Sequence, residues 1–272
     1  MPRAVLDAFW RALADTLRPR MLALTLLPLA ILLALVAGVA HVWGDALLAA
    51  ADRLLSATLM RSDWWSRWAG GGFQRMALGV LMLLALSVPA IVVLALLLVS
   101  LIVAPVALRR VAVRRFAGLA RRGRASVWAS VGVSLGASAL AGAAFVLTLP
   151  LWLVPGLVLV LPPLIWGWLA CRVLAFDALA EHASAHERRA LMRAHRVPLL
   201  LMGMACGWLG AAPGLMWMSG LLFAALFWLL VPLAIWVHTL VFTFSSLWFA
   251  HYGLRALQVQ REEQAIHGPS HG

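Results

Sequence analysis

Residues 197–254 read VPLLLMGMACGWLGAAPGLMWMSGLLFAALFWLLVPLAIWVHTLVFTFSSLWFAHYGL, a run of 58 residues without Asp, Glu, Lys or Arg. A helix needs roughly 20 apolar residues to cross the hydrocarbon core of a bilayer. The run therefore has room for two helices, and Pro213-Gly214 interrupts it where a turn would be needed. We predict a membrane-embedded helical hairpin in this part of the chain.

Three further stretches lack charged residues. Residues 21–44 and 76–108 each fit one crossing, and residues 125–171 have room for a second hairpin. Apolar residues make up 64% of the chain, charged residues 12%, and the mean hydropathy is +0.95. Soluble domains are about 45–50% apolar and about 25% charged. The sequence thus excludes a soluble enzyme and predicts an all-α polytopic membrane protein with two spanning helices and two hairpins.

Arginine supplies all 22 basic residues, and the chain contains no lysine and no asparagine. Both missing residues have AT-rich codons, which indicates a GC-rich bacterial genome and hence the inner membrane. Eighteen arginines fall in residues 1–20, 105–124, 172–196 and 251–272. Because arginine is concentrated in cytoplasmic loops, both termini are predicted to be cytoplasmic. The net charge of +12 predicts contacts with anionic lipid headgroups and not with nucleic acid.

The N-terminal segment has the pattern of a helix that lies on the membrane surface. Arg3, Asp7, Arg11 and Asp15 recur every four residues, and the opposite face is apolar. Opposite charges four residues apart support a helix, and the two faces suit the bilayer interface. Pro19 separates this helix from the first span. A cleaved signal peptide is disfavoured, because the segment before the apolar run is too long and carries two aspartates.

Both hairpins contain helix-breaking residues. In the second hairpin only 16 residues precede Pro213-Gly214, which is roughly 24 Å of helix and short of a ~30 Å hydrocarbon core. Irregular backbone at such depth is tolerated only against protein or water. We therefore expect hairpins that penetrate the bilayer in part, the alternative being ordinary spanning hairpins with proline kinks. In the first hairpin the prolines are Pro150, Pro155, Pro162 and Pro163.

These features describe a single membrane domain over residues 1–272. Its predicted parts, in order, are an interfacial helix (1–20), a span (21–44), an outer loop (45–75), a span (76–104), a basic cytoplasmic segment (105–124), a hairpin (125–175), a cytoplasmic helix (176–196), a hairpin (197–250) and a cytoplasmic tail (251–272).

Motifs of enzymes are scarce, and we predict that the chain is not an enzyme. There is no P-loop and no G-x-G-x-x-G. His182 and His186 have the spacing of metal ligands on a helix, but Ala183 stands where a zinc peptidase requires glutamate. An exposed helix with scattered histidines is the commoner case, so no metal and no cofactor are expected.

The apolar stretches contain no carboxylate. Proton relays and cation pores usually place Asp or Glu there, so both are disfavoured. An oxyanion can instead be held by arginine and by the N-termini of broken helices. Arg18 and Arg20 are the candidate anion-binding residues, and the alternative is that they bind lipid and fix the topology. Further arginines near the same cytoplasmic side are Arg109, Arg110, Arg114 and Arg115.

Several short motifs, in this order and spacing, resemble the CysZ-like sulfate permeases, which are grouped with homologues of etoposide-induced protein 2.4. The resemblance covers about residues 5–255 and implies an amphipathic helix, two spans, two partly penetrating hairpins and a homo-oligomer. It also implies sulfate as a substrate and Arg18 and Arg20 as its contacts. The motifs are RPR (18–20), LLPL (26–29), IVAP (102–105), WGW (166–168), RVLAFDALAEH (172–182) and PLLLMG (198–203).

Two functions of different classes follow from the sequence. The first is an inner-membrane permease or channel for a small oxyanion, with sulfate as the first candidate substrate. The sequence has no ATP site, so the flux of the anion is passive or coupled to an ion gradient. The second is a non-transporting scaffold or assembly factor, in which residues 176–196 dock a cytoplasmic partner.

Overall fold

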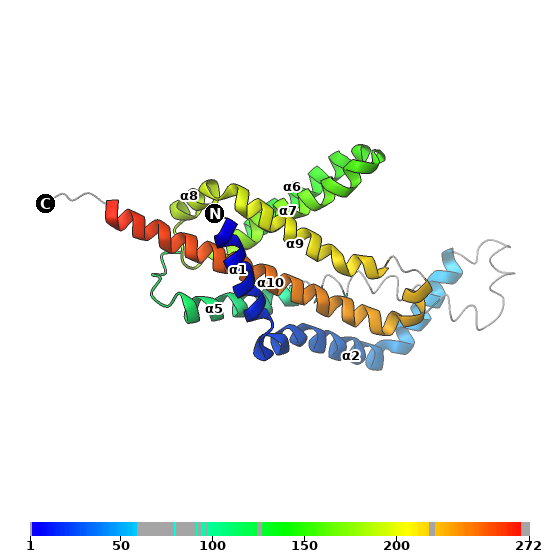
Figure 1. The fold of residues 1–272 in the computed structure, drawn as a ribbon. Helices are drawn as coiled ribbons and strands as arrows, with labels where there is room; N and C mark the ends of the chain where they lie inside the picture. The colour runs from blue at the N-terminus through cyan, green and yellow to red at the C-terminus, as the bar shows by residue number, and fades with distance from the viewer. Residues whose placement is uncertain are drawn as a thin grey trace. The chain divides into compact units, whose positions relative to one another are not determined.

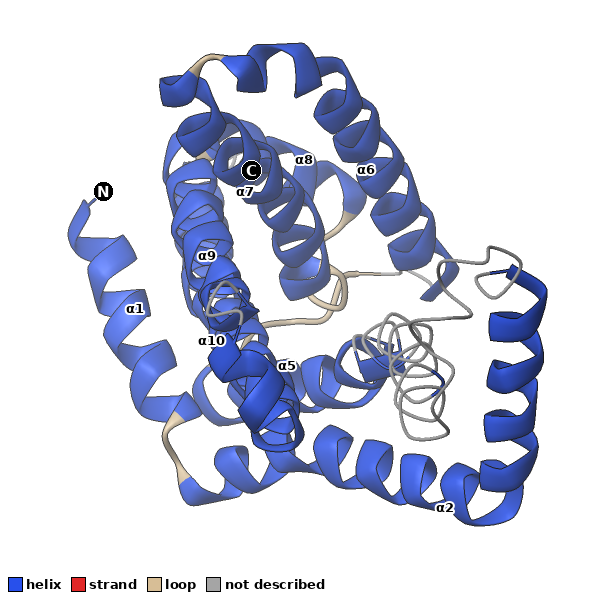
Figure 2. Ribbon diagram, turned by 90° about the vertical axis from the view of Figure 1, so that its right-hand side faces the viewer, coloured by secondary structure: helices blue, strands red, loops and turns tan. Residues whose placement is uncertain are grey.

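The computed structural model describes residues 2–58, 97–123, 127–217 and 221–267, with residues 79, 91, 94 and 95 between the first two ranges. Every regular element in these residues is a helix (Figure 2), and the chain is an all-α polytopic membrane protein, as predicted. The elements are α1 (Pro2–Thr16), α2 (Pro19–Thr58), the π-helical η1 (Val99–Val103), α5 (Ala104–Arg115), α6 (Val127–Thr148), the 3₁₀-helical η2 (Leu149–Leu153), α7 (Pro155–Leu179), α8 (Ala185–Ala194), α9 (Arg196–Trp217) and α10 (Leu221–His267).

Four of the described helices contain segments that are long and apolar enough to cross a membrane. Three are Pro19–Leu54 in α2, Ser130–Leu151 from α6 into η2, and Val160–Leu179 in α7, and the fourth is Leu229–Ile266 in α10. On α6, the side chains of Leu135 and Leu147 are 67% and 77% exposed. Large apolar side chains that are this exposed among the described residues suit contact with lipid.

The chain forms two compact units, and each is described by itself. The small unit covers Leu26–Leu101 and includes most of α2, whose side chains at Leu33 and Leu35 are about half exposed. The large unit combines Met1–Thr25 with Ile102–Gly272. It contains every helix from α5 to α10 as well as α1, and it holds the polar clusters described below.

Within the large unit, α10 contacts α1, α5, α7 and α9, whereas α6 packs on α7 (Figure 1). Helix α1 lies on α10 through Ala8 and Ala12, whose small side chains allow the two backbones to approach. Edge-to-face ring contacts join Phe9 to Phe244 and to Trp248 at centroid distances of 5.2 and 5.1 Å. Such pairs contribute about 0.5–1.5 kcal/mol each beyond the area they bury.

The opposite face of α1 is apolar and open. Leu6, Trp10 and Leu17 are each more than half exposed, whereas Ala12 is fully buried. Helix α1 thus has one apolar side against α10 and a second turned outward, and the second fits the predicted contact with the bilayer interface.

Glycines bring α7 and α9 together. A side chain at Gly203 would meet the carbonyl oxygen of Gly167, and one at Gly207 would lie 3.3 Å from the backbone nitrogen of Gly167. The glycine pair in α9 therefore mediates a contact within the chain, as small residues at four-residue spacing permit. The pair on α6, Gly132 and Gly136, faces no neighbour within 4 Å in the described part of the chain.

Four boundaries differ from those expected. Helix α9 continues through Pro213 and Gly214 to Trp217, so the turn expected at this pair is not there. Helix α7 continues through Pro162 and Pro163, because a membrane helix tolerates proline where neighbouring helices support the freed backbone groups. The expected helix 176–196 is divided: α7 ends at Leu179, and α8 begins after Ser184. The expected tail 251–272 is helical up to residue 267, as the end of α10.

Two other expectations extend beyond the described residues. In the expected outer loop 45–75, helix α2 continues to residue 58, and the remainder is not described; nor is most of the span 76–104. How deeply the two hairpins enter a bilayer stays a prediction.

Candidate anion-binding site

A basic pocket lies where the chain turns from α1 into α2, beside α5. Its volume is about 810 Å³. The turn is short because α1 ends at Thr16 and Pro19 occupies the first turn of α2, where a missing N–H costs nothing. The residues that line the arginine pocket, as we call it, are Asp15, Arg18, Pro19, Arg20, Met21, Arg110, Val111, Arg114 and Arg115.

Helix α5 supplies three of the arginines that line the pocket. Arg110, Arg114 and Arg115 are exposed, and Ala107 and Val111 are buried on the side that packs into the core. Positions four residues apart share a helix face, so the spacing of Arg110 and Arg114 brings both guanidinium groups to the pocket. The Nη1 atom of Arg110 donates to the carbonyl oxygen of Arg20 at 3.5 Å and thereby joins α5 to the start of α2.

Positive charge predominates in the pocket, which contains five guanidinium groups and one carboxylate. Arg20, Arg110 and Arg114 have no carboxylate within ion-pair distance among the described residues. Guanidinium groups present several N–H donors in a planar fork that matches the oxygens of carboxylates, sulfates and phosphates. The lining of the pocket therefore has donors of the kind that suit an anion with several oxygens.

The one carboxylate of the pocket is Asp15, whose residue surface is 5% exposed. Its Oδ2 lies 3.0 Å from Nε2 of His251 and 3.4 Å from Nε of Arg115. Its Oδ1 lies 3.2 Å from Nη1 of Arg18, within ion-pair distance but without the geometry of a hydrogen bond. Oδ1 is thus a buried acceptor with no hydrogen-bond donor in the described part of the chain.

Both residues predicted from the sequence, Arg18 and Arg20, line the pocket. Arg109, which the sequence grouped with the other α5 arginines, turns elsewhere and pairs with Glu181 at 3.3 Å. The sequence pattern had placed Asp15 in a surface series of charges, but the structure buries it against His251. That partner is 236 residues away, so no local signal pointed to it.

A second ion cluster, centred on Glu187, is fully bonded. Arg261 donates to both carboxylate oxygens, at 3.0 and 3.1 Å, and the backbone N–H of Ser184 donates to Oε2 at 2.8 Å. Ser184 and Glu187 form a capping box at the start of α8. The bonds from Arg261 lower the pKa of Glu187 from its ordinary 4.5 to about 2. This cluster fastens α8 to α10.

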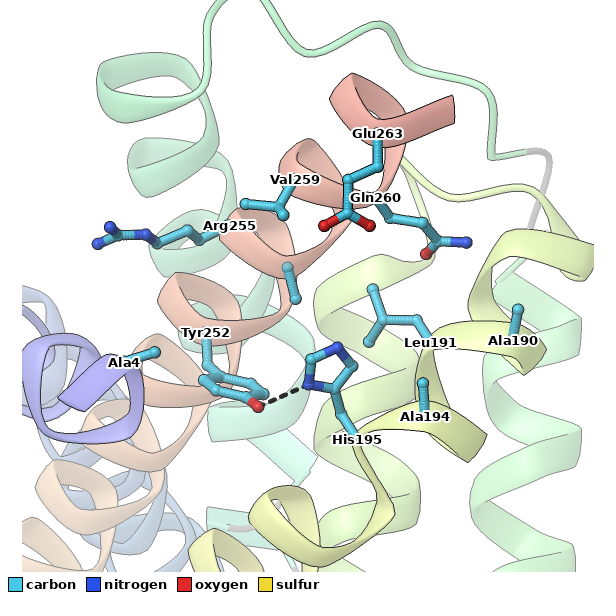
Figure 3. Close-up of a pocket in the computed structure, with 11 residues that line it drawn as sticks. Ala4, Ala190, Leu191, Ala194, His195, Tyr252, Arg255, Val259, Gln260 and Glu263 are labelled. Carbon is cyan, nitrogen blue, oxygen red and sulfur yellow. Dashed lines mark hydrogen bonds between the residues drawn. The ribbon is translucent and has the colours of Figure 1, made fainter. Parts of the chain in front are cut away.

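A second cavity, of about 540 Å³, is lined by α8, α10 and the start of α1 (Figure 3). His195 and Tyr252 are joined there by a hydrogen bond of 2.8 Å between Nδ1 and the phenol oxygen. Burial lowers the pKa of His195, which favours the neutral ring. The guanidinium of Arg255 is already paired with Asp7 at 2.6 Å. Most other lining residues are aliphatic, so this cavity is less suited to a small anion than the arginine pocket.

Residues with the spacing of metal or nucleophile motifs do not form a catalytic centre in the described residues. His182 is buried and His186 is exposed, and no group of three possible ligands is gathered around them. The sequence GVSLG at 132–136 has the spacing of a hydrolase nucleophile motif. It lies inside α6, however, and not at a strand-to-helix turn.

Comparison with known families adds to this picture. The sequence model described as sulfate transporter CysZ/etoposide-induced protein 2.4 matches residues 8–219, which is well over half of the chain. The chain belongs to this family. The match includes every residue of the arginine pocket, and His251 lies beyond it. No curated protein and no solved structure matches the chain. The family is a transporter-type family of membrane proteins, and the chain is a sulfate transporter-like membrane protein.

Proposed function

We propose that this protein is a permease or channel for a small oxyanion, with sulfate as the first candidate, in a bacterial inner membrane with both termini in the cytoplasm. The observation that carries the proposal is the arginine pocket, in which five guanidinium groups surround one carboxylate. The family supports transport of this class of ion, and the distribution of arginine supports the orientation.

The pocket suggests how an anion is taken up. Exposed arginines at the rim, Arg20, Arg110 and Arg114, attract it through their uncompensated charge. Arg18, whose side chain is 40% exposed, then exchanges its ion pair with Asp15 for the arriving anion. Attraction by several arginines replaces the hydration that the anion loses. Since the sequence contains no ATP site, the ion moves down its gradient or with a coupled ion.

Uptake of radiolabelled sulfate into proteoliposomes tests the proposal. The wild-type protein is expected to show saturable uptake above empty liposomes, and the double variant Arg18→Ala/Arg20→Ala is expected to lose it by about tenfold or more, since hydrogen bonds to charged groups contribute about 1.5–3 kcal/mol each. Arg109→Ala is the matched control, because Arg109 lies on α5 outside the pocket. If Arg18→Ala/Arg20→Ala and Arg109→Ala lose uptake equally, the arginine pocket is not the site at which the anion binds.

Assembly is a further part of the proposal. The open glycine face of α6, with Gly132 and Gly136, suits close helix contact between copies of the chain, and the exposed arginines suit anionic lipid headgroups. A non-transporting scaffold is the second candidate function. It is favoured by the exposed side chains of Arg189 and Arg193 on α8, and crosslinking of a stoichiometric partner that is lost on substitution of these two arginines would support it.

A further inference from the structure

The arginine pocket contains a feature that a site for a fully deprotonated anion does not need. Asp15 lines the pocket, is 5% exposed, and has one oxygen without a hydrogen-bond donor. A buried acceptor that stays unpaired is costly, and the cost is removed by any group that brings a proton to it. The two oxygens of Asp15 are therefore unequal: His251 and Arg115 hold Oδ2, whereas Oδ1 has only an ion pair with Arg18 at 3.2 Å and no hydrogen bond.

We infer that the pocket selects a protonated tetrahedral oxyanion, of the hydrogenphosphate class, over sulfate. This inference rests on the proposed oxyanion permease and replaces sulfate, its first candidate, with an ion of the same shape that carries a proton. The guanidinium groups bind the unprotonated oxygens of the anion, and its O–H group donates to Oδ1 of Asp15. Hydrogen bonds from a hydroxyl to a carboxylate are short and strong, so one proton on the ligand satisfies the one unpaired acceptor of the site.

Sulfate cannot make this bond at neutral pH, because all four of its oxygens are acceptors. A sulfate oxygen beside Oδ1 brings two negatively polarised acceptors together with no proton between them. Sites that hydrogen-bond a hydroxyl group of their ligand discriminate against analogues that lack it, since the partner in the site is then left unpaired. The same arginines that attract both ions thus favour the ion that carries a proton.

Arg18 controls access to the acceptor. Its Nη1 lies 3.2 Å from Oδ1 and its side chain is 40% exposed, so it has room to turn toward an arriving anion. On the other side, His251 is 2% exposed and its Nε2 lies 3.0 Å from Oδ2. The carboxylate is therefore held in place from α10 while Arg18 moves, and Oδ1 becomes available to the ligand.

Competition for uptake tests the inference. Proteoliposomes of phosphatidylcholine containing the wild-type protein are given labelled sulfate or labelled inorganic phosphate at neutral pH, with unlabelled sulfate, phosphate or monofluorophosphate as competitors. Monofluorophosphate is a phosphorus dianion without an O–H group. Phosphate is expected to compete at a concentration at least about tenfold lower than sulfate or monofluorophosphate, the lower end of the effect of one unpaired buried acceptor.

A variant sharpens the test. In Asp15→Asn the amide can donate to an anion and the negative charge is gone, so the preference for phosphate over sulfate is expected to fall by about tenfold or more. Asp7→Asn is the matched control: Asp7 is an aspartate of the same helix whose partners, Arg11 and Arg255, lie outside the pocket. This control is expected to keep the wild-type preference. The comparison of phosphate with monofluorophosphate in the wild-type protein tests the inference even when Asp15→Asn does not fold.

The outcomes separate the inference from the proposed function. Saturable uptake with sulfate or monofluorophosphate equal to or better than phosphate overturns the inference and leaves the oxyanion permease standing. No saturable uptake of either labelled ion overturns both. A second set of liposomes containing phosphatidic acid tests a lipid monophosphate as the source of the same chemistry. If phosphate competes in liposomes without phosphatidic acid but not in liposomes that contain it, the lipid monophosphate and free phosphate share the site, which supports the inference. If phosphate competes in neither set, the inference is overturned.

Discussion

The two buried carboxylates that arginine holds in the described part of the large unit, Asp15 and Glu187, differ in how completely they are bonded. Glu187 receives hydrogen bonds at both oxygens from one arginine and from the N-terminus of its own helix. Asp15 is surrounded by more positive charge, yet one of its oxygens has no hydrogen-bond donor. A saturated cluster has nothing left to offer a ligand and fastens helices together. An unsaturated cluster with surplus cations can bind one.

The largest expected effect on stability comes from breaking the saturated cluster. Arg261→Ala removes both bonds to Glu187 and the bonds to the carbonyl oxygens of Ala120 and His182. Loss of one partner of a fully buried ion pair costs about 3–5 kcal/mol. This pair is part-buried, with side chains 13% and 10% exposed, so the cost is lower, but the unfolding transition in detergent should still move to lower temperature. Arg261→Lys keeps the positive charge but lacks the forked guanidinium group. Its unfolding temperature is expected to lie between those of Arg261→Ala and the wild type. An unchanged transition in Arg261→Ala would show that the cluster is not structural.

Charge reversal in the arginine pocket is expected to reduce anion uptake and to leave stability nearly unchanged. Arg114→Glu places a second carboxylate in the arginine pocket, where Arg114 has no acidic partner among the described residues. Anion uptake is expected to fall by more than about tenfold, since like charge at the rim repels the ion, with the unfolding temperature little changed. Arg193→Glu on exposed α8 serves as the control for added negative charge. A loss of stability without loss of uptake would assign Arg114 to folding.

The pH dependence of stability distinguishes the saturated cluster from an ordinary surface pair. The pKa of Glu187 is lowered from 4.5 to about 2 in the folded protein. The contribution of ionised Glu187 to the free energy of unfolding is therefore complete above pH 4.5 and is lost as the pH falls toward 2. Unfolding temperatures measured in detergent across this range should decline less steeply in Glu187→Gln than in the wild type. Parallel curves for the two proteins would contradict the assignment.

The smallest effect is expected at the exposed pair of Asp7 and Arg255. The two atoms are only 2.6 Å apart, but the side chains are 40% and 55% exposed. Surface ion pairs contribute about 0–1 kcal/mol because water screens them and the side chains lose entropy. Asp7→Asn should thus shift the unfolding transition by less than Arg261→Ala, and a comparable shift would mean that α1 depends on this pair for its place on α10.

The sequence predicted some local features well and missed others that were present in it. The uncharged runs predicted apolar helices, and four of the described helices are long enough to span. The division of residues 176–196 had a local signal, since Ser184 and Glu187 have the spacing of a capping box. The continuity of α7 through Pro162 and Pro163 had none, because proline disfavours a helix locally and only the surrounding helices reverse that preference.

For the candidate site, the sequence alone determined which charged residues are present, and the tertiary structure decided which of their atoms interact. Arg18 and Arg20 beside Pro19 were visible as a basic turn before an apolar run, because topology signals lie next to the spans they orient. The unequal oxygens of Asp15 were not visible, because they depend on Arg115 and on His251, which is 236 residues distant. Charge and hydropathy act along the chain and can be counted from sequence. Which donor reaches which oxygen depends on how α1, α5 and α10 pack, and packing is decided only when the whole unit is folded.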